Sequence, residues 1–370
     1  MKDSRVFKLA SLLVNYSLRL KKGDTLIIEG SDATIPLIEA AYKEALKVGA
    51  HPDIRITLSS TKEQLLKVGT VDQLEHISPM EREGYENYDA HLIIWGDQNT
   101  KALSNVDTKN MSTHRAARKD IRMKFFKRLA ENKTKWCGTQ FPTHSDAQEA
   151  SMSLAEYEDF VFGAGLLNEE NPAEKWQDVS NEQQKICDYL DGKKGFRFVT
   201  KDTDITMSAH GRKWINCDGK ENFPDGEVFT TPVRDSVNGT IRFTYPAIYS
   251  NREVEDVTLT FKDGKVIEAS AEKGEDFLVS VLDTDEGARY LGEVAIGTNY
   301  GITYFSKNTL FDEKIGGTIH MAVGSGFEET GGTNESSVHW DMICDMKEEG
   351  KIYADDELIY EKGKFIVDFK

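Results

Sequence analysis

The chain has 370 residues, a length that predicts two domains rather than a single core. Its 46 basic and 63 acidic residues give a formal net charge of −17, which opposes binding to a nucleic-acid backbone or an anionic membrane surface. No run of about 18 apolar residues and no secretory leader pattern is present, so we expect a soluble protein that is not exported. Four scattered cysteines without a Cys-x-x-Cys pair predict reduced thiols and a cytoplasmic location.

The first half alternates between helical and strand periodicity. Helical spacing of apolar residues predicts helices at about 6–16 and 35–48, and short apolar runs predict strands at about 25–28, 53–58 and 91–95. Long helical patterns then dominate 112–133 and 145–192, interrupted at 163–165. Alternating strands and helices predict an N-terminal α/β domain, residues 1–190, with a mostly parallel sheet covered on both faces.

The second half, residues 191–370, is expected to be a β-rich domain. Short strand-like segments occur at 196–199 and 240–243, and one helix is expected at about 277–286. The segment 257–267 reads as a hairpin because Asp263-Gly264 is a strong turn signal between two apolar runs. The expected fold class is therefore α/β plus α+β, with an N-terminal α/β domain and a β-rich C-terminal domain.

A histidine-rich stretch near the C-terminus offers candidate metal ligands. His320 follows Gly316-Gly317, and His339-Trp340-Asp341 lies nineteen residues further on. In an extended segment residues i and i+2 point to the same side, so His339 and Asp341 can face one ion while Trp340 turns away. Imidazole and carboxylate are common metal ligands, but these residues alone leave a catalytic site incomplete.

Two upstream glutamates are candidates to complete the site. Glu227 follows a Pro/Gly turn and opens an apolar run, and Glu293 lies between small and apolar residues. A buried lone carboxylate is costly, and metal coordination would offset that cost. Taken singly, a solvated glutamate or a packed histidine is the commoner situation, and only the combination favours a metal site.

Several runs in the second half resemble one known family. NFPDGEVFTTP, LGEVAIGTN, LFDEKIGGTIHMAVG and HWDMI are similar to segments of the thermophilic aminopeptidase family of metallopeptidases, M29. The first half resembles it more weakly, in LASLLVNYSLRLKKGDTLIIEG and FPTHSDAQEASMSLAEYEDF. The resemblance implies a β-rich catalytic domain after an α/β domain, in a homodimer whose active sites face a sheltered interior.

The same resemblance implies the ligands and the reaction. The positions that match the family's metal ligands are Glu227, Glu293, His320, His339 and Asp341. It further implies two divalent ions, an activated water and release of N-terminal residues from short peptides, with Glu227 and Glu293 as the catalytic carboxylates. Zinc, cobalt and manganese all accept this nitrogen and oxygen donor set.

One position departs from the family pattern. A tyrosine usually lies seven residues after the histidine of the Gly-Thr-x-His run, where it is thought to donate to the reacting carbonyl, and here that residue is Phe327. Loss of one such donor costs about 2.7 to 4 kcal/mol in the barrier. Either another donor serves, with Tyr300, Tyr304 and His210 as candidates, or the protein is an altered amide or ester hydrolase, or a peptide-binding protein with little turnover.

The triplet Asp312-Glu313-Lys314 leaves two readings open. It lies shortly before His320, where it would place a carboxylate and a cation around the ligands. A solvated turn accounts for the same three residues equally well.

Overall fold

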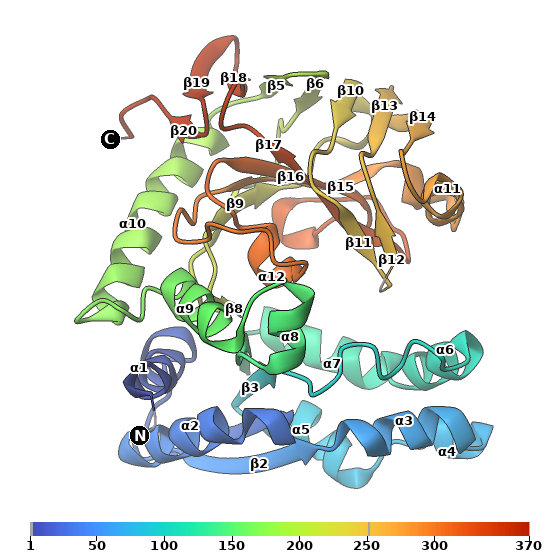
Figure 1. Ribbon diagram of the computed structural model, residues 1–370. Helices are drawn as coiled ribbons and strands as arrows, with labels where there is room; N and C mark the ends of the chain where they lie inside the picture. The colour runs from blue at the N-terminus through green and yellow to red at the C-terminus, as the bar shows by residue number, and fades with distance from the viewer. Residues whose placement is uncertain (1–2, 251, 370) are drawn as a thin grey trace. The chain divides into compact units, whose positions relative to one another are not determined.

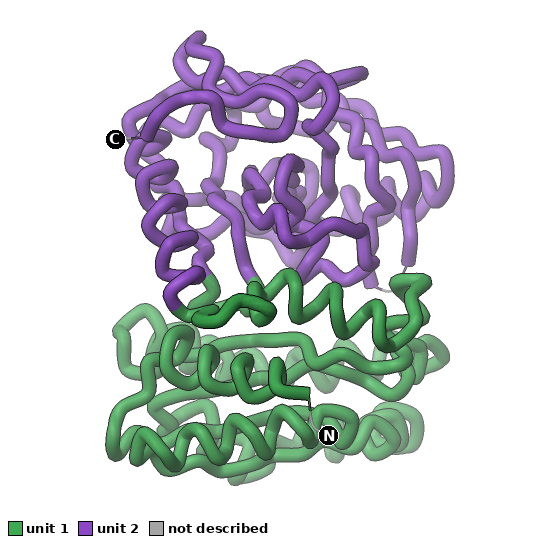
Figure 2. Tube along the Cα trace, turned by 60° about the vertical axis from the view of Figure 1, so that its left-hand side comes forward, with its two compact units in different colours: residues 1–173, 219–224 green, residues 174–218, 225–370 purple. Residues whose placement is uncertain are grey.

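The computed structural model describes residues 3–250 and 252–369. The chain forms two compact units (Figure 2): residues up to 173 together with 219–224, and residues 174–218 together with 225 onwards. The sequence suggested domains of 1–190 and 191–370. The compact units divide earlier because helix α10 (Pro172–Asp191) buries Ile186, Cys187 and Leu190 in the core of the second unit.

The first unit contains a parallel sheet, as predicted (Figure 1). Its strand order is β2-β1-β3-β4-β8. The strands are β1 (Thr25–Ser31), β2 (His51–Thr57), β3 (Ala90–Trp95), β4 (Lys135–Gln140) and β8 (Asn222–Phe223). The sequence patterns did not reveal β4 or β8. β8 is only two residues long. It lies in the short segment 219–224, which belongs to the first unit although the residues on either side of it belong to the second, and no local periodicity can indicate such a segment.

Helices cover both faces of this sheet. The helices of this unit are α1 (Ser4–Leu12), continued by a π-helical turn (Leu13–Ser17), α2 (Ile35–Lys47), α3 (Ser59–Val68), α4 (Val71–Glu75), α5 (Pro79–Asn87), α6 (Thr108–Ala117), α7 (Lys119–Ala130), α8 (His144–Glu149) and α9 (Leu154–Ala164). On β1, Gly30 faces Ile38 of α2. Ile27, three residues earlier and therefore on the opposite face of the strand, faces Gly84 of α5. Because successive residues of a strand point to opposite faces, α2 and α5 lie on opposite sides of the sheet.

His91 is a buried histidine on the α5 side of this sheet. It is 4% exposed and lies between the rings of Tyr85 and Phe125, with centroids 5.8 and 4.7 Å away. Its Nε2 has no hydrogen-bond partner among the described residues. Burial lowers the pKa of His91 to about 4, because the imidazolium would lose its hydration.

This histidine is expected to make the protein less stable in acid. The pKa is lower in the folded state than in the unfolded chain, so the unfolded chain takes up the proton first and stability falls as the pH drops from about 6.5 to about 4. The full loss is roughly 3 kcal/mol. His91→Phe should remove this part of the acid sensitivity, measured by calorimetry at pH 7 and pH 4.5. The same substitution at exposed His76 is the control. If His91→Phe lost as much stability between pH 7 and pH 4.5 as the wild type does, His91 would not be a source of the acid sensitivity.

The second unit is rich in antiparallel strands. One sheet has the order β14-β13-β10-β6-β5-β18-β19-β20, a second has the order β17-β16-β15-β9-β7, and β11 pairs with β12. The first sheet contains β5 (Gly195–Thr200), β6 (Thr203–Ser208), β10 (Asn238–Arg242), β13 (Thr258–Lys262), β14 (Lys265–Ser270), β18 (Lys351–Ala354), β19 (Glu357–Glu361) and β20 (Lys364–Phe365). The second contains β7 (Ile215–Cys217), β9 (Glu227–Thr230), β15 (Leu291–Gly297), β16 (Thr318–Gly324) and β17 (His339–Asp345).

Two local predictions for this unit are confirmed. Between β13 and β14, Asp263 and Gly264 have φ of 49° and 81°, as a hairpin turn with two left-handed residues requires. The predicted helix is α11 (Glu275–Leu282), beside β14 in Figure 1. The remaining α-helix and strands are α12 (Thr309–Asp312), β11 (Ala247–Tyr249) and β12 (Arg252–Val254). Among the described residues, no helix has the length and apolar character to cross a membrane.

Candidate metal centre

The five-stranded sheet of the second unit places all five predicted ligands on one face. Glu293 of β15 lies opposite Ala322 of β16, which in turn lies opposite Asp341 of β17. Residues directly opposite across a ladder share a face, and so do residues two apart along a strand. His320 is two residues before Ala322, and His339 two before Asp341. Glu227 of β9 joins the same face through Gly297, its partner on β15.

Small residues between the ligands leave room on this face. The residues that share this face with Glu293 on β15 are Ala295 and Gly297, and those that share it with His320 on β16 are Ala322 and Gly324. A larger side chain at these positions would fill the space between the carboxylates and imidazoles. The face is therefore shaped for a compact polar cluster rather than for an apolar core.

A strained turn and a helix side chain position Glu227. Gly226 has φ of 122°, and a Cβ there would lie 2.6 Å from the Cβ of Asn299, so only glycine fits. Its carbonyl accepts a hydrogen bond from the Thr298 amide at 2.8 Å. From α10, the Gln183 amide donates to the Glu227 carbonyl at 3.1 Å. Glu227 thus begins β9 with its backbone fixed on two sides.

Both histidines present Nε2 to the cluster. Nδ1 of His320 lies 2.9 Å from the Glu313 carbonyl, and Nδ1 of His339 lies 2.9 Å from the Ser325 carbonyl. A carbonyl can only accept, so Nδ1 carries a proton in each ring, and Nε2 is the nitrogen that faces the carboxylates and could ligate a metal. Such a backbone contact is the usual way in which a metal-ligating histidine is oriented.

The donor atoms form overlapping groups around Glu293. One Glu293 oxygen is 3.6 Å from His320 Nε2, and the other is 3.1 Å from His339 Nε2. Glu227 Oε2 is 3.6 Å from His320 Nε2, and Asp341 Oδ1 is 3.5 Å from His339 Nε2. The groups with metal-binding spacing include Glu227–Glu293–His320 and Glu293–His339–Asp341, with a further group of Glu313, His320 and Asp341.

The cluster strongly stabilises positive charge. Burial alone would lower the pKa of His320, but the nearby carboxylates outweigh it and raise the pKa to about 10. Burial would also lower the pKa of His339, but the nearby carboxylates, Asp341 above all, outweigh burial and raise that pKa to about 12. Burial raises the pKa of Glu227 to about 7, partly offset by Lys314. In the absence of metal, protons on the imidazoles and the ammonium of Lys314 balance the carboxylates.

Lys314 is a second cation at the edge of this cluster. Its side chain is 0% exposed, and its ammonium lies 3.6 Å from Glu227 and 4.0 Å from Asp225, and also donates to Glu313. Burial would lower the pKa of Lys314, but these carboxylates hold it well above its usual value. Asp312 is also buried and accepts from the amide and hydroxyl of Ser306. The triplet is therefore a buried ion cluster and not a solvated turn.

Phe327 lies directly beside the cluster. Its ring centroid is 5.2 Å from that of His339 and 5.1 Å from that of Phe229, in edge-to-face contacts. Of the three alternative donors, Tyr300 gives its hydroxyl to the Gly363 carbonyl at 2.7 Å, and Tyr304 and His210 are exposed. Tyr300 is therefore already committed to a structural hydrogen bond.

The residues present fit divalent metal ions. Glu227 Oε2 and Asp341 Oδ1 are buried and accept no hydrogen bond from the described residues, although buried carboxylate oxygens normally do. Both oxygens belong to the groups with metal-binding spacing. Two oriented imidazole nitrogens complete a donor set suited to zinc, cobalt or manganese.

Sequence reasoning missed several residues that support the cluster. Gln183 and Ser325 act through backbone or amide contacts, and no composition signal marks such partners. Lys314 was noted in the Asp312-Glu313-Lys314 triplet, but the sequence left open whether the triplet surrounds the ligands or forms a solvated turn. The residues around this lysine, Asp-Glu before it and Ile-Gly-Gly after it, show no hydrophobic periodicity. Only the tertiary packing therefore reveals that its side chain is buried.

Comparisons with known proteins show which family the chain is similar to. The sequence pattern of the family described as "Thermophilic metalloprotease (M29)" matches residues 2–365. Aminopeptidase AmpS of Bacillus subtilis is 26% identical over 92% of both chains, and Aminopeptidase T of Thermus thermophilus is 28% identical over 96% of this chain and 95% of its own. The solved structure of AmpT from Thermus thermophilus superimposes with a TM-score of 0.87 at 24% identity, covering 98% of this chain and 99% of that chain.

A second solved structure shares the fold at lower similarity. It is 2,5-dihydroxypyridine dioxygenase from Pseudomonas putida, with a TM-score of 0.61, 12% identity, and coverage of 100% of this chain and 99% of that chain. The fold alone therefore does not determine the chemistry. The match to the family's sequence pattern spans nearly the whole chain, and on that basis the chain belongs to the M29 family of thermophilic metalloproteases.

Proposed function

We propose that this protein is a metal-dependent aminopeptidase that releases N-terminal residues from short peptides. The observation that carries the proposal is the pair of ligand groups that share Glu293 on one sheet face. Membership of a metallopeptidase family and the aminopeptidase names of the relatives support the reaction class. The acidic chain, at −17, is compatible with peptides rather than nucleic acids as partners.

We assign two divalent ions to the cluster. Glu227, Glu293 and His320 would hold one, and Glu293, His339 and Asp341 the other, because Glu293 belongs to both groups. Three carboxylates bring about −3, which two divalent ions overcompensate. When bound, such ions polarise a carbonyl and lower the pKa of water, which is the chemistry that peptide hydrolysis needs.

The protein's own residues supply orientation and proton handling. The backbone carbonyls of Glu313 and Ser325 fix the imidazole tautomers, and Gln183 fixes the start of β9. Glu227 and Glu293 are the carboxylates proposed to take part in catalysis, because both are buried and each has an oxygen 3.6 Å from His320 Nε2. Phe327 forms an apolar wall beside His339 where it would contact substrate.

The partners and the setting follow from the same assignment. A free α-amine distinguishes an aminopeptidase substrate, because a blocked peptide lacks one anchoring contact. We further propose a homodimer in a reducing, cytoplasmic compartment, in keeping with four free cysteines, three of which are buried. The preferred side chain of the substrate is a separate question for a peptide panel.

The test is metal removal and restoration. Purified protein is stripped of metal, loaded separately with zinc, cobalt or manganese, and assayed for amino acids released from free and N-acetylated peptides, with His339→Ala alongside. The expected result is metal-restored release from free peptides only, lost in the variant. Hydrolysis of acetylated peptides would favour the altered hydrolase instead.

Phe327→Tyr is tested in the same assay, because phenylalanine lacks the hydroxyl that a tyrosine at this position would donate to the reacting carbonyl. If the metal-loaded wild type releases nothing while Phe327→Tyr does, the missing hydroxyl limits turnover. If neither releases anything while both bind peptides, the protein binds peptides without hydrolysing them. Phe7→Tyr, at a surface position that is 45% exposed, controls for a general effect of the added hydroxyl.

A further inference from the structure

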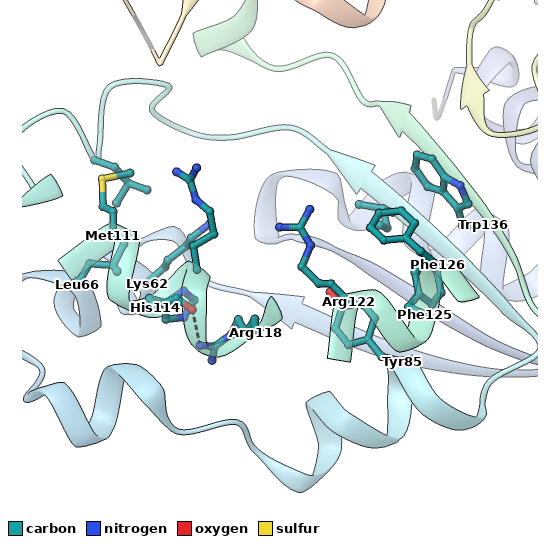
Figure 3. A pocket seen from close by; sticks show the side chains of 13 residues that line it. Lys62, Leu66, Tyr85, Met111, His114, Arg118, Arg122, Phe125, Phe126 and Trp136 are labelled. Carbon is teal, nitrogen blue, oxygen red and sulfur yellow. Dashed lines mark hydrogen bonds between the residues drawn. The ribbon is translucent and has the colours of Figure 1, made fainter. Parts of the chain in front are cut away.

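The first unit contains a pocket of about 490 Å³ that is unrelated to the metal-binding residues (Figure 3). It lies on the side of the parallel sheet where α5 packs, and α3, α5, α6 and α7 contribute its walls. Ile93 of β3 and Trp136 of β4 line it as well. Its volume is within the range of small-molecule sites in proteins, about 300 to 1,000 Å³.

One end of the pocket is aliphatic and the other aromatic. Leu66 and Met111 lie at one end in Figure 3, and Phe125, Phe126 and Trp136 at the other. Phe126, on helix α7, is 55% exposed at the aromatic end of the pocket. Apolar side chains left open in this way mark a surface that binds something.

The charged residues of the pocket are all basic. Lys62, Arg115 and Arg122 line it, and their side chains make no hydrogen bond or ion pair with any described residue. Arg118 differs, because Glu81 and the carbonyls of Leu74 and His114 hold its guanidinium. No acidic residue is among the thirteen that line the pocket.

This concentration of positive charge contrasts with the rest of the chain, whose formal charge is −17. Burial lowers the pKa of His114 in the pocket wall, and Arg118 and Lys62 lower it further. The pocket thus combines an apolar lining with unpaired cations, and its charge complement is an anion.

We propose that the pocket binds a small amphipathic acid, a molecule with an aromatic or aliphatic body and a single carboxylate. The body would lie against Phe126, Trp136 and Met111, and the carboxylate would pair with Arg122, Arg115 or Lys62. Charge-assisted pairs of this kind are stronger than neutral ones, and the arginine fork matches a carboxylate. This site is independent of the proposed peptidase activity.

The test compares an acid with its neutral counterpart by calorimetry on the full chain. The probes are 6-phenylhexanoate and 6-phenylhexanamide, which share the same body and differ in charge. The acid is expected to bind about 10-fold or more tightly than the amide, with an affinity that falls as salt is added. Equal affinities, or no binding of the acid up to about 1 mM, would overturn the proposal.

Matched variants locate the site. Lys62→Gln, Arg115→Gln and Arg122→Gln combined should bring the affinity for the acid down to that for the amide. Lys22→Gln, Lys43→Gln and Lys119→Gln remove the same charge outside the pocket and should leave binding unchanged. Circular dichroism verifies folding, and the single variant Arg122→Gln serves if the triple variant unfolds.

Two other results would also count against the proposal. Equal loss of acid binding in both triple variants would mean that general surface charge attracts the acid. Conversion of a dimer to a monomer by the pocket variants, without acid binding to either form, would assign the pocket to a contact between copies of this chain.

Discussion

Glu293→Gln is expected to lower kcat/KM for release of an N-terminal residue by about 10³-fold and to weaken metal binding at both positions. Glu293 faces His320 with one oxygen and His339 with the other, so a neutral amide removes a ligand from both groups at once. His339→Ala removes a member of one group only. The two variants should therefore differ in the amount of metal retained, about none against about one ion per chain.

Metal content after dialysis, measured by mass spectrometry, and activity with saturating metal are the two measurements. Glu268→Gln on β14 is the matched control, because it makes the same chemical change at an exposed position. If Glu293→Gln retained two ions, Glu293 would not be a shared ligand. If it retained both ions and lost activity, its role would be proton transfer alone.

Lys314→Met is expected to destabilise the metal-free protein by about 3 to 5 kcal/mol. The ammonium is fully buried and faces Glu227, Glu313 and Asp225, so its loss leaves buried carboxylates without a counter-charge. Methionine keeps an unbranched apolar chain, which limits the packing change. A divalent ion held by Glu227 supplies positive charge again, so saturating zinc should reduce the difference between variant and wild type.

Calorimetry of both proteins with and without zinc measures this effect, and the shift in the transition of the second unit is the quantity to compare. Lys265→Met, at an exposed position of β14, controls for the loss of a lysine in general. A shift equivalent to less than 1 kcal/mol in the metal-free protein would contradict the role of Lys314 as counter-charge. An unchanged difference on adding zinc would separate Lys314 from the metal-binding residues.

Much of the fold could be predicted where residues act locally. The alternation in the first half correctly indicated a parallel sheet with helices on both sides, and Asp263-Gly264 correctly indicated a hairpin. The helical patterns at 112–133 and 145–192 are confirmed too, since helices α6 to α10 occupy most of both ranges, although α7 ends at 130. Helical spacing shows that a helix forms but not where tertiary contacts end it.

The candidate site divides in the same way between local and long-range information. The alternation in β17 placed His339 and Asp341 on one side, as expected of an extended segment. The sequence also marked the segment before Glu227 through Pro224 and Gly226, and the structure shows a φ of 122° at Gly226, which favours glycine. Which carboxylates meet which imidazoles depends on strand order, and the order β17-β16-β15-β9 is set by packing of the whole sheet.

The sequence by itself determined the residue types, the strand alternation around the ligands and, through its motifs, the family. Only the tertiary structure decided that Glu293 lies between the two histidines, that Lys314 is buried among carboxylates, and that Lys62, Arg115 and Arg122 surround an apolar pocket. The physical reason is separation along the chain. Local propensity acts over a few residues, whereas burial and charge pairing depend on residues about 20 to 90 positions apart that meet only once helices and sheets have packed.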